Sequence, residues 1–172
     1  MPSPTERISA APKLSATVLE VSIMETVDKL NIADEMLDAA IDEFLDRKRY
    51  FSAVNLACVA EEIYGKFVRT EGGRDAQHDL INDAIQYSVD GGGPDYTTKE
   101  MKAVANHNKN SIKHFDSGAD RFIEIDSFDE ARLSIATAME NHARAGRTET
   151  EAHRRFKEFA TEYVHHHLLN SD

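Results

Sequence analysis

Apolar residues recur at intervals of three, four and seven positions along most of the chain, which is the spacing of helices with one buried face. From about Ile23 to Asp46 this spacing is kept by Ile23, Val27, Leu30, Leu37, Ile41 and Phe44. The segment from about Tyr50 to Thr70 is apolar on nearly every side, so we expect it to be the central helix of a bundle. Four more helices are predicted, through Leu80 to Tyr87, from about Thr98, from Phe128 to Gly146, and from Glu149.

Several predicted helices begin with a capping box, in which Ser or Thr precedes Glu by three residues and the two satisfy each other's backbone N–H groups. The four pairs are Ser22 with Glu25, Thr97 with Glu100, Ser127 with Glu130, and Thr148 with Glu151. No alternation of polar and apolar residues predicts a strand, although a short extended piece is expected to pack Phe122, Ile123 and Ile125 against the bundle. We therefore predict an all-α fold, a compact bundle of five or six helices.

Length and composition fit one domain, because 172 residues with 41% hydrophobic side chains suffice for a single core. Residues 1–22 are predicted to form a flexible N-terminal arm, and residues 23–169 the helical-bundle domain. The single cysteine, Cys58, excludes an internal disulfide and favours a reducing compartment. Because no secretory or membrane-spanning segment is evident, we expect a cytoplasmic protein with no membrane partner.

The formal net charge of -11 works against broad contact with nucleic acid or anionic lipid. The helix from Thr98 is the exception, because between residues 99 and 114 only Glu100 opposes Lys99, Lys102, Lys109 and Lys113. A phosphate group would be attracted to this helix. The alternative is that these lysines pair with the acidic first helix of the same or a neighbouring subunit.

Within that helix, Asn106, Lys109, Asn110 and then Lys113 or His114 follow at steps of three or four, so one face offers amide, amine and imidazole groups together. His114 is the candidate acid or base, because the unperturbed pKa of imidazole lies near 6.5. The competing interpretation is that His114 caps the C-terminal end of the helix.

Glu61 lies on the apolar central helix, where a partly buried carboxylate needs a cationic partner. That partner is either Lys109, Lys113 or His114, or a structural partner elsewhere, and in both cases Glu61 would orient a site rather than react. The three consecutive histidines at 165–167 point in different directions on a helix, and zinc ligands on one helix prefer spacings of three or four. We therefore predict no metal site, and no cofactor.

The segment Lys109-Asn110-Ser111-Ile112-Lys113-His114 resembles the motif of the HEPN (higher eukaryotes and prokaryotes nucleotide-binding) superfamily. In that motif an Arg, usually followed by a polar residue, is separated by four positions from a His near the end of a helix. The segments AVNLACVAEEIYGKF, KHFDSGAD and AMENH are similar to an uncharacterised group of small bacterial helical proteins. The resemblance covers roughly Leu30 to Tyr163.

The resemblance implies a compact helical bundle, often a dimer with its two motifs facing each other, and in active members metal-independent cleavage of RNA. His114 would be the catalytic histidine, Asn110 its polar companion, and Lys109 would stand in the place of the Arg. Lysine keeps the charge but lacks the planar fork that grips a phosphate, so the sequence leaves open whether this protein is an enzyme. Lys113, Asn106 and Glu61 complete the predicted site as ligand-binding residues.

These observations predict a HEPN-like homodimer that binds or cleaves RNA, or binds a nucleotide, with an antitoxin or the product of a neighbouring gene as another class of partner. The alternative is a non-catalytic structural or protein-interaction module. In that case the same residues form a buried polar network with Glu61 and Asn141 that holds helices or subunits together.

Overall fold

The computed structural model describes residues 24–115 and 118–168, and the predicted N-terminal arm, residues 1–22, lies outside this range. In the described residues there are six α-helices and no strand, so the predicted all-α fold is confirmed. The helices are α1 (Lys29–Leu45), α2 (Tyr50–Thr70), α3 (Ala76–Asp90), α4 (Thr98–Lys113), α5 (Ser127–Arg144) and α6 (Glu151–Leu168), with a short 3-10 helix, Gly118–Arg121, between α4 and α5.

The first helix begins later than the spacing of its apolar residues predicts. Residues 24–28 are not helical, and α1 starts after Asp28, whose carboxylate accepts a hydrogen bond from the Leu30 N–H at 2.9 Å. Val27 continues the apolar spacing but is exposed to solvent among the residues that the structure describes. The start of α1 is therefore set by the capping aspartate rather than by the periodicity.

Two other helix starts also differ from the predicted capping boxes. At α5 the cap is Asp126, one residue before the predicted Ser127. At α6 the Thr150 hydroxyl accepts a hydrogen bond from the His153 N–H at 3.3 Å, so the helix begins two residues after the predicted Thr148 cap. In each case a neighbouring oxygen satisfies the exposed N–H groups of the first turn.

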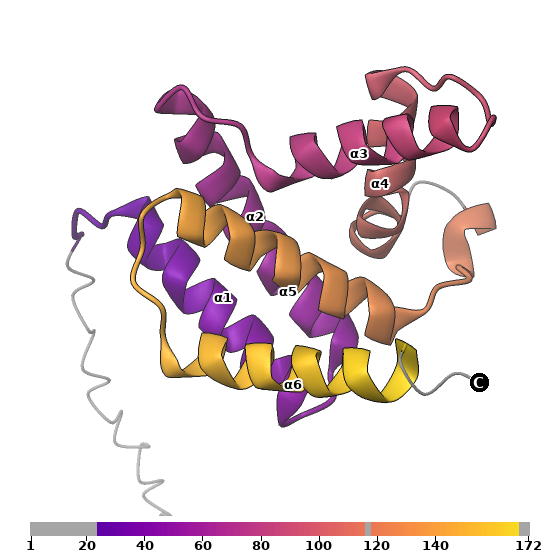
Figure 1. Ribbon diagram of the computed structural model, residues 1–172. Helices are drawn as coiled ribbons and strands as arrows, with labels where there is room; N and C mark the ends of the chain where they lie inside the picture. Colours follow the sequence, from indigo (N-terminus) through magenta and orange to yellow (C-terminus); the bar gives the residue numbers. More distant parts are fainter. Residues whose placement is uncertain (1–23, 116–117, 169–172) are drawn as a thin grey trace, which may run out of the picture.

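The buried core residues lie on α1, α2, α5 and α6, whose arrangement Figure 1 shows. Helices α1 and α2 are joined by residues 46–49 and pack as a hairpin, and α5 lies against both while α6 packs across α1. The largest buried apolar side chains are Leu37, Ile41, Phe44, Val54, Tyr64 and Ile135. Helix α2 is the central helix, as predicted, because it contacts α1, α4 and α5. Its first turn is open on one side, where the Phe51 side chain is 50% exposed.

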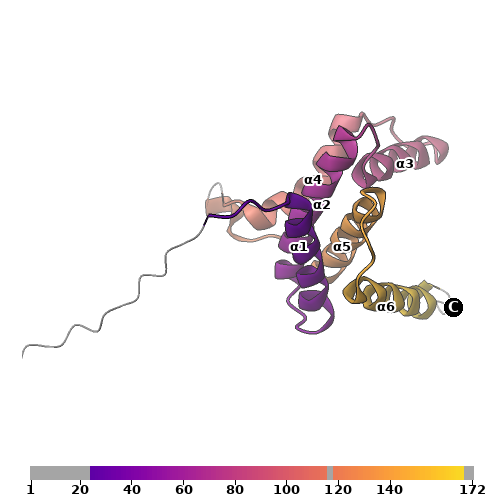
Figure 2. The same ribbon diagram turned by 90° about the vertical axis from the view of Figure 1, so that its left-hand side faces the viewer.

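Helices α3 and α4 form a second hairpin at one end of this core (Figures 1 and 2). Helix α3 buries only Ala76 and Ile81, and α4 has no buried residue. The hairpin is therefore packed far more lightly than the four core helices. Of the three side chains predicted to pack against the bundle, Phe122 and Ile123 are exposed, so the prediction is wrong for them, whereas Ile125 is half-buried.

Candidate functional site

The predicted site lies on the second half of α4, a helix that is fixed at both ends. At its start the Thr97 hydroxyl accepts from the Glu100 N–H at 3.3 Å, and the Glu100 carboxylate accepts from the Thr97 N–H at 2.8 Å, so this capping box is confirmed. At its end the chain becomes extended at His114, whose N–H donates to the Asn110 carbonyl at 3.0 Å. His114 is thus the C-cap residue of α4, and its side chain stands beyond the last turn.

An ion pair between Lys109 and Glu61 attaches α4 to α2. The Nζ of Lys109 lies 2.7 Å from Oε2 of Glu61, and both side chains are only 12% exposed. Burial alone would lower the pKa of Lys109, but the nearby Glu61 carboxylate outweighs this and the pKa is raised. Lys109 therefore remains charged, with that charge neutralised inside the protein.

Amide side chains extend this contact into a polar network between four helices. Asn141 is buried in α5, where its Nδ2 donates to the Glu61 carbonyl at 3.4 Å and its Oδ1 accepts from the Ala76 N–H at 2.7 Å. On α4 itself, Asn106 accepts a hydrogen bond from Gln77 at 2.8 Å. The network links α2, α3, α4 and α5, so it sets the orientation of α4 relative to the other three helices and determines which face of α4 is exposed.

Between α2 and α4 runs a cavity of about 340 Å³, which we call the α2–α4 groove. Five of the six predicted site residues line it, namely Glu61, Asn106, Lys109, Asn110 and Lys113. Lys102 also lines the groove, although its spacing did not mark it as part of the site.

The charges on the two walls of the groove differ. On the α2 wall, Lys66 pairs with Glu62 at 2.7 Å and Arg69 pairs with Asp75. On the α4 wall, the ammonium groups of Lys102 and Lys113 are exposed and form no ion pair with any residue in the described part of the chain. The uncompensated positive charge of the groove therefore comes from α4.

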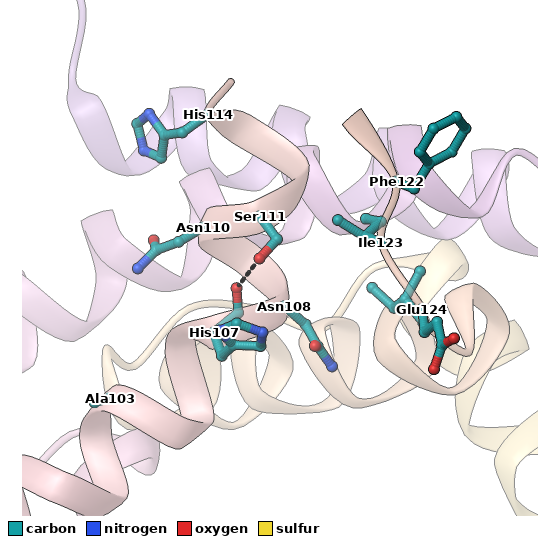
Figure 3. Close-up of a pocket in the computed structure, with 10 residues that line it drawn as sticks. Ala103, His107, Asn108, Asn110, Ser111, His114, Phe122, Ile123 and Glu124 are labelled. Atoms are coloured by element: carbon teal, nitrogen blue, oxygen red, sulfur yellow. Dashed lines mark hydrogen bonds between the residues drawn. The ribbon is translucent and has the colours of Figure 1, made fainter. Parts of the chain in front are cut away.

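His114 is the one predicted site residue that does not line the groove. It borders a separate hollow of about 570 Å³ with His107, Asn108 and the segment 122–125 (Figure 3). In Figure 3 its ring is turned away from Phe122 and Glu124, and Asn110 stands between the two cavities. The structure thus does not bring the predicted catalytic trio of His114, Lys109 and Asn110 into one cavity.

Beneath the groove lies Cys58, the single cysteine of the chain. The residue is buried, as the sequence predicts, and burial raises the pKa of its thiol. A buried thiol with a raised pKa is a poor nucleophile, so Cys58 belongs to the packing of the groove floor.

Sequence reasoning missed a second polar cluster, in which α5 and α6 cross α1. The rings of His142 and His153 meet edge to face with centroids 4.4 Å apart, and both side chains are buried. The Nε2 atoms of His142 and His153 form no hydrogen bond with the described part of the chain. They lie 3.8 Å from Asp34 Oδ1 and 3.4 Å from Asp38 Oδ1, respectively. Burial lowers the pKa of both imidazoles, so they are neutral near pH 7.

The carboxylate of Asp34 joins this cluster to α2 and to the turn before α6. Burial would raise the pKa of Asp34, but hydrogen bonds from Arg147 and from the Tyr64 hydroxyl outweigh that effect, and the pKa is lowered. The sequence signal for the cluster is positional, because His142 follows the core residue Ile135 by seven positions, and His153 precedes the core residue Phe156 by three.

Within residues 24–115 and 118–168, no group of three or more His, Cys, Asp or Glu side chains is arranged to hold a metal ion. In that same part of the chain, every helix is too short or too polar to cross a membrane. Comparison of the chain with protein-family models, with curated proteins and with solved structures gives no match. The chemistry of the α2–α4 groove is therefore the basis for assigning a function.

Proposed function

We propose that the protein binds the phosphate groups of RNA or of a nucleotide in the α2–α4 groove. The observation that carries this proposal is the pair of unpaired, exposed ammonium groups of Lys102 and Lys113 on one wall of the groove, in a chain of net charge -11. Eleven residues of helix separate the two lysines, a rise of about 16 Å, so they can meet different phosphates of one strand. The exposed amide of Asn110 lies between them and can donate a hydrogen bond.

Lys109 has a different role in this proposal. Its ammonium group is nearly buried and neutralised by Glu61, so it supports α4 rather than gripping a phosphate. The resemblance of residues 109–114 to the HEPN motif also points to the C-terminal half of α4. In this protein the lysine at the position of the Arg, Lys109, has a structural role. Because His114 and Lys109 line different cavities, they do not meet at one phosphate, and the protein holds its ligand without cleaving it.

A second candidate function is a structural or protein-interaction module, and the Glu61, Lys109 and Asn141 network supports it. In that candidate the network serves only to join helices, and a second copy of the chain covers the exposed face of α4. The two candidates differ in what the exposed lysines do, because a scaffold does not need Lys102 and Lys113 for binding of a phosphate.

Binding of a labelled single-stranded RNA, followed by fluorescence anisotropy at several salt concentrations, tests the proposal. The double variant Lys102→Gln/Lys113→Gln is compared with Lys48→Gln/Lys99→Gln, which removes the same charge from exposed positions outside the groove. We expect only the groove variant to lose affinity, and the slope of log K against log salt to fall by about 0.7 for each lost lysine contact. Equal losses in both variants would show non-specific binding and contradict the proposal.

Cleavage is tested separately by incubating the same RNA with the wild-type protein and with His114→Ala in the presence of EDTA. We expect the RNA to stay intact with both proteins. Cleavage that occurs with the wild-type protein and disappears in His114→Ala would instead establish the ribonuclease that the HEPN resemblance implies.

A further inference from the structure

Beyond the α2–α4 groove, the C-terminal end of α4 borders a hollow of about 460 Å³ that also reaches the first turn of α2. Two aromatic side chains line it: Phe51, from α2, is 50% exposed, and Phe115, which follows the end of α4, is 69% exposed. Exposed phenylalanine rings forgo the free energy of burial, about 25 cal/mol for each Å² of apolar surface. The rings of Phe51 and Phe115 together give the hollow an apolar surface with flat aromatic faces, and nothing in the described part of the chain covers it.

The same hollow is lined by two cationic side chains, Lys113 and Arg121, and by the imidazole ring of His114. Lys113 forms no ion pair with any described side chain, and the Arg121 guanidinium lies 5.4 Å from the centroid of the Phe122 ring. Lys113 also lines the α2–α4 groove, so the hollow continues the positively charged surface of α4. Asn55 adds a hydrogen-bonding edge, because its Nδ2 donates to the Phe51 carbonyl at 3.1 Å and holds the amide in place.

Aromatic faces beside cationic side chains match the chemistry of single-stranded nucleic acids, whose unpaired bases stack on rings while their phosphates meet lysine and arginine. We infer that the ligand of this protein is a single strand with an unpaired base that enters the hollow between Phe51 and Phe115. This inference rests on the proposed function, because it takes the phosphates of that strand to lie along Lys113 and Lys102 in the groove.

The inference also separates this ligand from other polyanions. A duplex keeps its bases stacked on one another, so it cannot place a base in the hollow. A base-free polyphosphate meets the lysines but gains nothing from the rings. A partner protein that needs only an apolar surface leaves the exposed ammonium group of Lys113 without a role.

Four ligands are needed for the test: a single-stranded RNA oligomer, its duplex, a mononucleotide, and inorganic polyphosphate. Phe51→Leu and Phe115→Leu keep an apolar side chain but remove the stacking face, and Tyr87→Leu is the matched control, because Tyr87 is 83% exposed on α3 and borders none of these cavities. We expect each phenylalanine variant to lose at least about fivefold in affinity for single-stranded RNA and to keep its affinity for polyphosphate. The control keeps both affinities, and the wild-type protein binds the single strand more tightly than the other three ligands.

The outcomes separate the inference from the function on which it rests. Equal affinity for RNA and polyphosphate, unchanged in the phenylalanine variants, overturns base stacking but leaves phosphate binding in place. Equal affinity for the mononucleotide and the oligomer overturns the strand in favour of a free nucleotide. Absence of binding to all four ligands overturns both proposals. Light scattering gives one more result: if Phe115→Leu converts a dimer to a monomer with RNA affinity unchanged, the rings form an interface between copies and the inference is wrong.

Discussion

Lys109 and Glu61 join two helices across 48 residues of sequence through one ion pair, with 2.7 Å between Nζ and Oε2. The lysine that the HEPN resemblance would assign to a phosphate is the residue that fixes α4 to the core. The groove therefore has two kinds of lysine: Lys109, which is structural, and Lys102 and Lys113, which are free to meet a ligand.

The first prediction concerns this ion pair. Lys109→Met leaves the Glu61 carboxylate nearly buried without a partner, and we expect it to lower the free energy of unfolding by about 2 to 3 kcal/mol, as measured by urea denaturation. The double variant Glu61→Leu/Lys109→Met removes both charges, so we expect it to recover to within about 1 kcal/mol of the wild-type protein.

The control for these variants is the ion pair of Glu62 and Lys66, which lies on α2, like Glu61, but is exposed. Lys66→Met is expected to change the free energy of unfolding by less than about 1 kcal/mol. A loss of that small size in Lys109→Met would show that the pair contributes no more than a surface contact.

The second prediction concerns pH and the two buried histidines. In the unfolded chain His142 and His153 take up protons as the pH falls through about 6.5, whereas the fold lowers both pKa values and keeps the rings neutral. Below about pH 6.5 the unfolded state thus binds more protons, and stability falls with decreasing pH by up to about 1.4 kcal/mol per unit for each histidine. The loss ends once the pH is below the lowered pKa values.

Urea denaturation between about pH 5 and 8 measures this slope, in a range where the carboxylate of Asp34 stays ionised because its pKa is lowered. We expect His153→Phe to reduce the slope by about half, because one of the two groups no longer takes up a proton. His107→Gln changes an exposed histidine and serves as the control. An unchanged slope in His153→Phe would assign the pH dependence to other groups.

The third prediction concerns which helices unfold locally most often. Because α4 has no buried residue and α3 has two, we expect their backbone amides to exchange with deuterium faster than those of α1, α2 and α5. Thr97→Ala, which removes the cap of α4, is expected to speed exchange in α4 and to cost about 1 kcal/mol locally. Thr98→Ala is the neighbouring control, and equal exchange across all six helices would contradict the prediction.

The fourth prediction uses Cys58 as a reporter of the groove. Its burial and raised pKa predict that iodoacetamide labels it far more slowly in the folded protein than in urea. Since α4 covers this thiol through Lys109, we expect Glu61→Gln to speed the labelling. A rate unchanged by Glu61→Gln would mean that the ion pair does not control access to the groove floor.

The sequence allowed the approximate bounds of two helices to be predicted. Helix α2 spans Tyr50–Thr70, in agreement with the predicted range of about Tyr50 to Thr70, and α4 begins at Thr98, after the Thr97 capping box. The start of α1 could not be predicted in this way, because periodicity shows which face of a helix would be buried but not whether a partner exists to cover it. Val27 keeps the spacing, but residues 24–28 are non-helical and exposed, with no described element covering them.

For the candidate site, the need of Glu61 for a cation followed from its apolar surroundings. Its choice of Lys109 over Lys113 depends on how α4 crosses α2, which no local pattern records. The contact of His142 with His153 depends in the same way on how α5 meets α6. Each histidine alone is an unremarkable polar residue on an apolar face.

The fully buried core side chains, among them Leu37, Tyr64 and Ile135, come from α1, α2, α5 and α6, and α4 adds only the half-buried Ile112 at the edge of this core. Sequence changes at exposed positions of the α3–α4 hairpin, such as Lys102 and Lys113, thus cost little folding free energy, unlike a change at the nearly buried Lys109, while they alter the surface that meets a ligand. We expect the sequences of related proteins to vary more on the exposed face of this hairpin than in the core. Substitutions on that face are therefore the way to change binding specificity while the core stays the same.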